Sequence, residues 1–145
     1  ADVSASDISV GALDTARQNA AELGAKVEFA QGSWFDTDRP SEGRYDVIVS
    51  NPPYIESGDE HLSQGDLRFE PQNALTDFSD GLSHIRHITQ EAPKYLKANG
   101  WLLFEHGYDQ GEAVRNIMLE NGFAEVATEQ DLAELDRVTL GRLPA

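Results

Sequence analysis

Short apolar runs alternate with amphipathic stretches along this chain, and that alternation is typical of an α/β fold with a mostly parallel sheet. The apolar runs predict strands over residues 3–6, 26–30, 45–50, 101–106, 123–128 and 137–143. The last two runs lie too close in sequence for a helical crossover, so we expect them to form an antiparallel hairpin. The run YDVIVS at 45–50 has little polar alternation, which predicts a buried strand.

Apolar residues at helical spacing predict helices over residues 10–23, 82–96 and 113–118. Ser9 and Gly24 flank the first helix and are residue types that begin and end helices. Pro93 should kink the second helix because proline removes a backbone donor, and Asn99-Gly100 should end it. Residues 31–44 are expected to form a loop. The long polar stretch from 55 to 80 is also irregular, and connections of that length are often functional.

Composition narrows the class of protein. The chain has 145 residues, enough for one domain, and it has no cysteine, which excludes disulfides and thiol catalysis. No apolar run approaches the roughly 20 residues that span a bilayer, and no secretory signal pattern opens the chain, so we expect a cytoplasmic location. The net charge is −15, with 11 scattered basic residues. That charge argues against a nucleic-acid groove and fits either a basic protein partner or a merely solubilising surface.

The sharpest motif is Asn51-Pro52-Pro53-Tyr54, directly after the predicted strand at 45–50. Open α/β sheets bind ligands at the carboxyl ends of their strands. Each proline restrains the residue before it and lacks an N–H, so the turn is stiff and its carbonyls are free to accept. The Asn51 amide oxygen and the Pro52 carbonyl can therefore accept from one planar NH₂ group, with Tyr54 against its flat face.

This cradle suits methyl transfer to an amide or exocyclic amine. Such a nitrogen is a poor nucleophile because its lone pair is delocalised. Two acceptors aimed at its hydrogens favour pyramidalisation and stabilise the charge that develops as the methyl group arrives. The alternative is an ordinary Pro-Pro turn after a strand, and the position of the motif favours the catalytic interpretation.

Asp7, Ile8 and Trp34 are candidate cofactor contacts. An acid after a strand of a Rossmann-like unit normally accepts from ribose hydroxyls, and Ile8 would then pack on an adenine. The alternatives are that Asp7 only helps to start the helix that follows and that Trp34 belongs to the core. His84 and His87 lie three apart on a predicted helix, but no cysteine or carboxylate cluster accompanies them. We therefore predict a solvated helix face and no metal site.

Taken together, these segments resemble the glutamine N5-methyltransferases of peptide-chain release factors, the HemK/PrmC family. The resemblance rests on SDIS at 6–9, SWF at 33–35, VSNPPYI at 49–55, QGDLRFEP at 64–71, LLFEHG at 102–107 and RVTLGR at 137–142. The NPPY motif alone is shared with DNA adenine methyltransferases. Its combination with the downstream QGDLRFEP is far more specific to the glutamine enzymes.

The resemblance implies a Rossmann-like class I S-adenosylmethionine-dependent methyltransferase fold. Asp7 would bind the ribose of S-adenosyl-L-methionine, with Ile8 and Trp34 at its adenine. Asn51 to Tyr54 would hold the substrate glutamine, with Asn51 also near the methionine moiety, and Asn51, Pro52 and Tyr54 would be the catalytic residues. The substrate would be the Gly-Gly-Gln loop of peptide chain release factors in the cytoplasm.

The chain departs from the family pattern in three ways. Ser33 stands where an acid is usual, and residues 132–136 lack the usual glycine-containing sequence. The family's glycine-rich cofactor loop, the strand before it and the N-terminal helical domain are missing, so residues 1–145 are expected to be a partial catalytic domain that is inactive alone. Two other interpretations stay open, a DNA adenine-N6 methyltransferase and a non-catalytic interaction fragment.

Overall fold

The computed structural model describes residues 1–37, 45–55, 59, 71, 75–76 and 79–145. These residues divide into two compact units, Ala1–Ser41 and Glu42–Ala145. Each unit has a sheet of its own. The predicted QGDLRFEP segment lies almost wholly outside the described residues.

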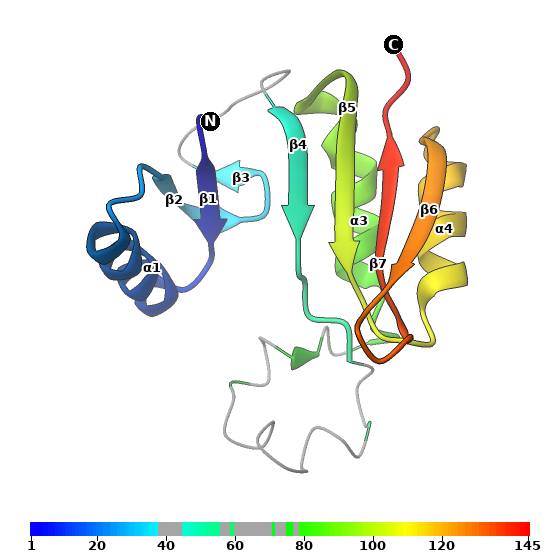
Figure 1. The fold of residues 1–145 in the computed structure, drawn as a ribbon, viewed down its shortest axis with the longest axis horizontal. Coiled ribbons are helices and arrows are strands. Elements are labelled where there is room, and N and C mark those ends of the chain that lie inside the picture. The colour runs from blue at the N-terminus through cyan, green and yellow to red at the C-terminus, as the bar shows by residue number, and fades with distance from the viewer. Residues whose placement is uncertain (38–44, 56–58, 60–70, 72–74, 77–78) are drawn as a thin grey trace. The chain divides into compact units, whose positions relative to one another are not determined.

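The first unit has a three-stranded sheet and one helix (Figure 1). Its elements are β1 (Ser4–Asp7), α1 (Val10–Leu23), β2 (Glu28–Ser33) and β3 (Asp36–Thr37). β1 and β2 are parallel, and β3 is antiparallel to β2. Ser9 caps α1, since its Oγ accepts from the Ala12 N–H at 3.2 Å, and Gly24 ends it in the left-handed region at φ 65°. Both caps confirm the sequence prediction.

The β2–β3 hairpin occupies part of the segment 31–44 that sequence reasoning expected to be a loop. β2 continues to Ser33, and the chain turns at Trp34, which has φ 57°. Gly32 permits the turn because a Cβ at that position would lie 2.0 Å from the Asp36 carbonyl oxygen. Apart from that glycine the hairpin has no clear sequence signal, which explains why the pattern missed it.

The second unit is a four-stranded sheet with helices behind it in Figure 1. Its elements are β4 (Tyr45–Ser50), α3 (Ser83–Glu91), a 3₁₀ turn η3 (Ala92–Lys94), β5 (Leu96–Glu105), α4 (Gly111–Glu120), β6 (Ala124–Gln130) and β7 (Asp136–Arg142). The strand order is β4-β5-β7-β6. β4 and β5 are parallel, whereas β7 is antiparallel to both β5 and β6. The expected antiparallel hairpin at the end of the chain is confirmed.

The predicted helix over 82–96 is too long. The α-helix ends at Glu91, and Pro93 lies in the 3₁₀ turn that follows, because proline cannot supply the next helical hydrogen bond. Asn99 and Gly100 do not end a helix. They lie in an irregular part of β5, where the pairing register shifts between Tyr45–Leu96 and Val47–Trp101, and their backbone groups bond to Leu143.

One face of the second sheet is packed against the helices. Leu102, Phe104 and His106 alternate along β5 and the end of the strand, and all three are fully buried. Leu102 pairs with Gly141 of β7, and a Cβ at Gly141 would lie 2.9 Å from Cε of Met118 in α4. This face therefore looks toward α4. The helices contribute further fully buried apolar side chains, Ile85 and Ile88 of α3 and Val114 and Met118 of α4.

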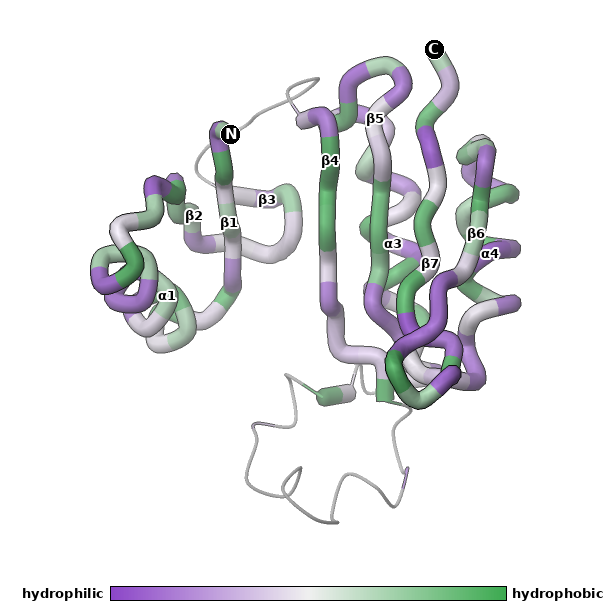
Figure 2. Tube along the Cα trace, viewed as in Figure 1, coloured by the Kyte–Doolittle hydropathy of each residue, from purple (hydrophilic) through white to green (hydrophobic). Residues whose placement is uncertain are grey.

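The opposite face of the same sheet is open within the described residues. Val49, Leu103 and Leu140 are register partners across β4, β5 and β7, so they share this face. Val47 is 50% exposed and Val49 is 72% exposed. β4 is apolar along much of its length in Figure 2, yet it is not the buried strand that its sequence predicts. Helix packing covers only one side of it.

Candidate functional site

The parallel pairing of β4 with β5 brings two candidate segments to one edge of the second sheet. Ser50, the last residue of β4, pairs with Phe104, the penultimate residue of β5. The Asn51 turn and the His106-Gly107 turn therefore leave the sheet side by side (Figure 1). This edge is where open α/β sheets place ligands.

The Asn51-Pro52-Pro53-Tyr54 turn is anchored through its first proline and open at its asparagine. Pro52 is fully buried, whereas Asn51 is exposed. Pro53 and Tyr54 are half-buried. Within the described part of the chain, neither the Asn51 side chain nor the Pro52 carbonyl takes part in a hydrogen bond. The Asn51 amide is thus open to a planar NH₂ group, whereas the Pro52 carbonyl belongs to a fully buried residue.

The peptide group that follows Tyr54 is held at both ends. Its carbonyl accepts from Nε2 of Gln110 at 2.9 Å, and its N–H, on Ile55, donates to the Leu75 carbonyl at 2.9 Å. Gly81 packs against the same carbonyl: a Cβ on Gly81 would lie 2.3 Å from it, and the residue has φ 80°. The far end of the turn is therefore fixed by contacts from segments distant in sequence.

A buried chain of hydrogen bonds supports the neighbouring turn. His106 Nδ1 lies 2.8 Å from the Gly107 carbonyl, which can only accept, so Nδ1 carries a proton. Burial lowers the pKa of His106 and favours the neutral ring, so Nε2 accepts from Thr139 Oγ1 at 2.7 Å. Thr139 in turn accepts from Thr128 at 2.8 Å, and Thr128 accepts from Arg115 at 2.7 Å. In this chain of bonds, running from Arg115 to the Gly107 carbonyl, each donor therefore faces an acceptor.

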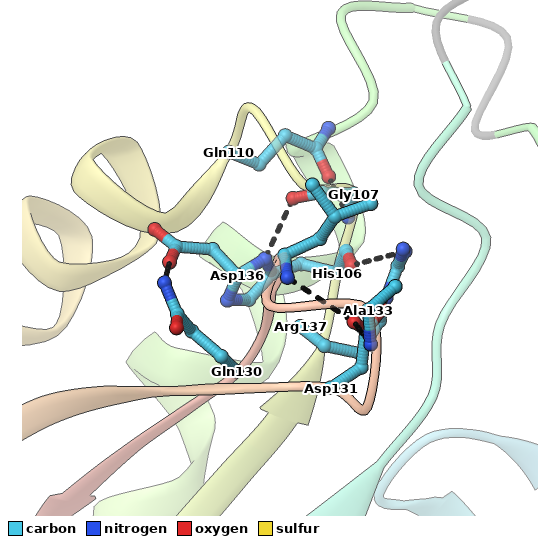
Figure 3. A network of polar contacts seen from close by, with 9 residues as sticks. His106, Gly107, Gln110, Gln130, Asp131, Ala133, Asp136 and Arg137 are labelled. Carbon is cyan, nitrogen blue, oxygen red and sulfur yellow. Dashed lines mark hydrogen bonds and ion pairs between the residues drawn. The ribbon is translucent and has the colours of Figure 1, made fainter.

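Arg137 joins this edge from the start of β7 (Figure 3). Its Nη1 donates to the His106 carbonyl at 3.2 Å, and its Nε pairs with Asp131 at 3.2 Å. A hydrogen bond from the Leu135 N–H, together with Arg137, lowers the pKa of Asp131. Burial alone would lower the pKa of Arg137, but the hydrogen bond to Asp131 and the negative charge of that carboxylate outweigh burial and raise it. A fixed cation therefore lies near the turn.

The first unit gathers the other predicted site residues. Asp7 ends β1 and Trp34 directly follows β2, and the strands are parallel, so both lie at the carboxyl end of this sheet. The Trp34 carbonyl accepts from Ser6 Oγ at 3.1 Å. Asp7 Oδ1 accepts from the Ser9 N–H at 2.7 Å, so this acid does help to start α1. Its other oxygen makes no hydrogen bond within the described residues, and Ile8 is 64% exposed beside it.

Sequence reasoning missed Gln110 and gave Arg137 no role of its own. Gln110 precedes α4, and nothing in its local pattern indicates a bond to Tyr54, 56 residues away. His84 and His87 lie on α3 as expected. Among the described residues, no cluster of metal-ligating side chains is present, and no helix is both long and apolar enough to cross a membrane.

Comparison with known proteins identifies the family. The family model described as "Methyltransferase domain" matches residues 1–137. The chain belongs to the methyltransferase domain family. Among curated relatives, this methyltransferase domain is 70% identical over 140 residues to a protein of Neisseria gonorrhoeae named "Release factor glutamine methyltransferase", covering 97% of this chain and 51% of that protein. A protein of the same name from Vibrio cholerae is 52% identical, and the match covers 94% of this chain and 48% of that protein. The chain spans about half the length of these relatives.

Solved structures agree on the fold. A methyltransferase of Pyrococcus furiosus has a TM-score of 0.72 at 15% identity, covering 99% of this chain and 64% of that one. The ribosomal protein L11 methylase of Lactobacillus delbrueckii subsp. bulgaricus has a TM-score of 0.65 at 19% identity, and the match covers 98% of this chain and 58% of that one. The α/β expectation, a Rossmann-like class I S-adenosylmethionine-dependent methyltransferase fold, is confirmed.

The buried imidazole of His106 predicts a pH dependence of stability for this methyltransferase domain. Because its pKa is lowered in the folded state, the unfolded state binds the extra proton first as the pH falls. The stability contribution is complete above the ordinary value of 6.5 and is lost as the pH falls from there through the lowered folded pKa. Denaturant unfolding of the full-length protein should therefore show stability decreasing as the pH falls below the ordinary histidine value of 6.5.

His106→Gln should remove this component of the pH dependence, because the titrating ring is gone. His87→Gln is the matched control, since His87 lies on the exposed side of α3. The control should keep the wild-type slope of unfolding free energy against pH. Equal slopes for wild type and His106→Gln would contradict the assigned tautomer network.

Proposed function

We propose that this chain is part of the catalytic domain of an enzyme that methylates the glutamine side-chain nitrogen, N5, of the Gly-Gly-Gln motif in peptide chain release factors. The observation that carries the proposal is the exposed Asn51 amide on a turn anchored by buried Pro52, at the carboxyl edge of β4. The name shared by the relatives supports the substrate class. We assign the reaction to the cytoplasm, where peptide release takes place.

The residues of the first unit fit S-adenosyl-L-methionine as the methyl donor. Asp7 has an oxygen available for ribose hydroxyls beyond the one that accepts from Ser9. Exposed Ile8 offers an apolar surface for adenine, and half-buried Trp34 lies at the same end of the sheet. When bound, the cofactor supplies an electrophilic methyl group. Asp7, Ile8 and Trp34 would hold its nucleoside part.

The turn residues orient and activate the acceptor nitrogen. Asn51 Oδ1 and the Pro52 carbonyl each accept one hydrogen of the substrate amide, which favours pyramidalisation and localises the lone pair on the nitrogen. As the nitrogen gains positive charge, both dipoles stabilise it without having to reorient. The half-buried Tyr54 ring covers the flat face of the amide and excludes water. No strong base is needed, because the nitrogen becomes acidic as it is alkylated.

The same cradle would suit the exocyclic amine of adenine, so charge decides between the two substrates. The chain carries −15, and duplex DNA is bound mainly through phosphate contacts to basic side chains. A protein substrate is therefore favoured over DNA. A non-catalytic fragment would give no reason for the exposed Asn51 amide on a turn anchored by buried Pro52.

We also propose that these residues are only part of their catalytic domain, and that in the longer protein a further segment pairs with β4 and covers the open face of its sheet. β4 pairs only with β5 among the described residues. Val47 and Val49 are large apolar side chains that lie exposed on it. Such an edge invites pairing, and the relatives are about twice as long as the chain.

The substrate proposal predicts that the full-length protein transfers labelled methyl groups to a release factor and not to duplex DNA. A release factor whose Gly-Gly-Gln glutamine is replaced by alanine serves as the matched negative substrate. Scintillation counting after separation of the products measures both reactions. Preferential labelling of DNA, or equal labelling of the alanine-substituted release factor, would refute the proposed substrate.

Asn51→Ala should lower kcat about 100- to 1,000-fold, as expected for the loss of one preorganised electrostatic contact. Thermal unfolding should change little, because the Asn51 side chain is exposed and makes no hydrogen bond within the described residues. Asn116→Ala, at an exposed position of α4, is the control and should keep wild-type kinetics. Near-normal turnover of Asn51→Ala would remove it from the catalytic machinery.

Val49→Asp tests the covered-face proposal. If another segment covers β4 in the full-length protein, a carboxylate at 49 becomes buried, and the unfolding free energy should fall by more than about 2 kcal/mol. Leu132→Asp introduces the same charge at a fully exposed turn and should cost less than about 0.5 kcal/mol. Denaturant titration compares them. Equally small costs would mean that this face stays open to solvent.

A further inference from the structure

We propose that Gln110 is a positioning residue for the Asn51–Tyr54 turn: its amide ties the Tyr54 carbonyl to the β5–α4 junction and so sets the orientation of the acceptors on Asn51 and Pro52. The inference rests on the proposed function of that turn. Gln110 does not contact the predicted substrate position itself. It acts through the backbone of Tyr54.

Both ends of the Gln110 amide are used. Oε1 accepts from the Gly107 N–H at 2.7 Å, while Nε2 donates to the Tyr54 carbonyl at 2.9 Å. The reversed amide would set two donors against each other at Gly107 and two acceptors at Tyr54. Only a group with a donor at one end and an acceptor at the other satisfies both contacts, which a carboxylate cannot do.

The Gln110 side chain does not cap the helix that it precedes. Gln110 is the residue immediately before α4, yet its side chain makes no capping hydrogen bond to that helix. It reaches instead to a segment 56 residues away in sequence. Gln110 is half-buried, so water competes poorly for these bonds.

Gly107, the other end of the bridge, is itself fixed. Its carbonyl accepts from Nδ1 of His106 at 2.8 Å and from the Gln110 N–H at 3.0 Å. His106 is fully buried and bonded through Nε2 to Thr139 at 2.7 Å. The bridge thus connects the turn to the buried hydrogen-bond chain of the core, and Figure 3 shows its Gly107 end.

Fixing Tyr54 fixes the whole turn. Proline rings set φ at both Pro52 and Pro53, and each proline restrains the residue before it. The turn therefore moves nearly as one body, with its freedom at its two ends. Gln110 and Leu75 hold the two atoms of the peptide group at the far end. Misplacement by about 1 Å can cost on the order of 100-fold in rate, so this restraint matters for catalysis.

Gln110→Glu tests the proposal in the full-length protein. The variant keeps an acceptor for the Gly107 N–H and replaces the donor to Tyr54 with a second acceptor. We expect kcat for release factor methylation to fall about 10- to 100-fold, with KM for the cofactor changed less than about twofold, since only an orientation is lost.

Asn121→Asp is the matched control at the other end of α4. Asn121 Nδ2 also donates to a backbone carbonyl, that of Ile117, at 2.8 Å. The control therefore suffers the same chemical change with a similar effect on stability, and it should keep wild-type kcat. A wild-type kcat in Gln110→Glu, or an equal loss of kcat in Asn121→Asp, would overturn the positioning role.

Hydrogen exchange gives a readout that does not depend on activity. The Ile55 N–H belongs to the same peptide group as the Tyr54 carbonyl, and it donates to Leu75. Gln110→Glu should accelerate exchange at Ile55, and Asn121→Asp should not. If the wild-type protein fails to methylate a release factor, the proposed function fails while this measurement still decides the bridge. Unchanged exchange at Ile55 would refute it.

Discussion

The parallel pairing of β4 with β5 is the interaction on which the site depends. It brings the Asn51 turn and the His106-Gly107 turn to one edge. Because β7 runs antiparallel to β5, its first residues return to that edge and deliver Arg137 to the His106 carbonyl. Three chain segments far apart in sequence therefore meet there as a consequence of strand direction alone.

That edge combines rigidity with available polar groups. Pro52 is buried and the Tyr54 peptide group is bonded at both ends, so the turn loses little entropy when it receives a ligand. Among the described residues, no buried side-chain polar atom lacks a partner. The exposed Asn51 amide makes no hydrogen bond to any described residue. A fully hydrogen-bonded interior behind an exposed acceptor is what preorganised stabilisation of a developing charge requires.

Much of this was predictable from local sequence. Apolar runs located the main strands, Ser9 and Gly24 located the ends of α1, and the two prolines marked the turn. The errors arose where distant contacts override local pattern. The Asn99-Gly100 segment looks like a helix end in sequence, but its backbone groups bond to Leu143, more than 40 positions away. The Gln110 bridge has no periodic signal, because it joins positions 56 residues apart.

The apolar sequence of β4 does not match the exposure of its side chains. A strand with one solvent-exposed face normally alternates apolar and polar residues. YDVIVS instead has apolar residues at three successive positions, which suits burial on both faces. In the described structure, helices cover one face and Val47 and Val49 stay exposed on the other. The apolar pattern of β4 therefore exceeds the burial that the described residues give it. This supports the proposal that another segment of the longer protein completes the sheet. On that proposal, stability measured on these 145 residues would understate that of the domain in the longer protein.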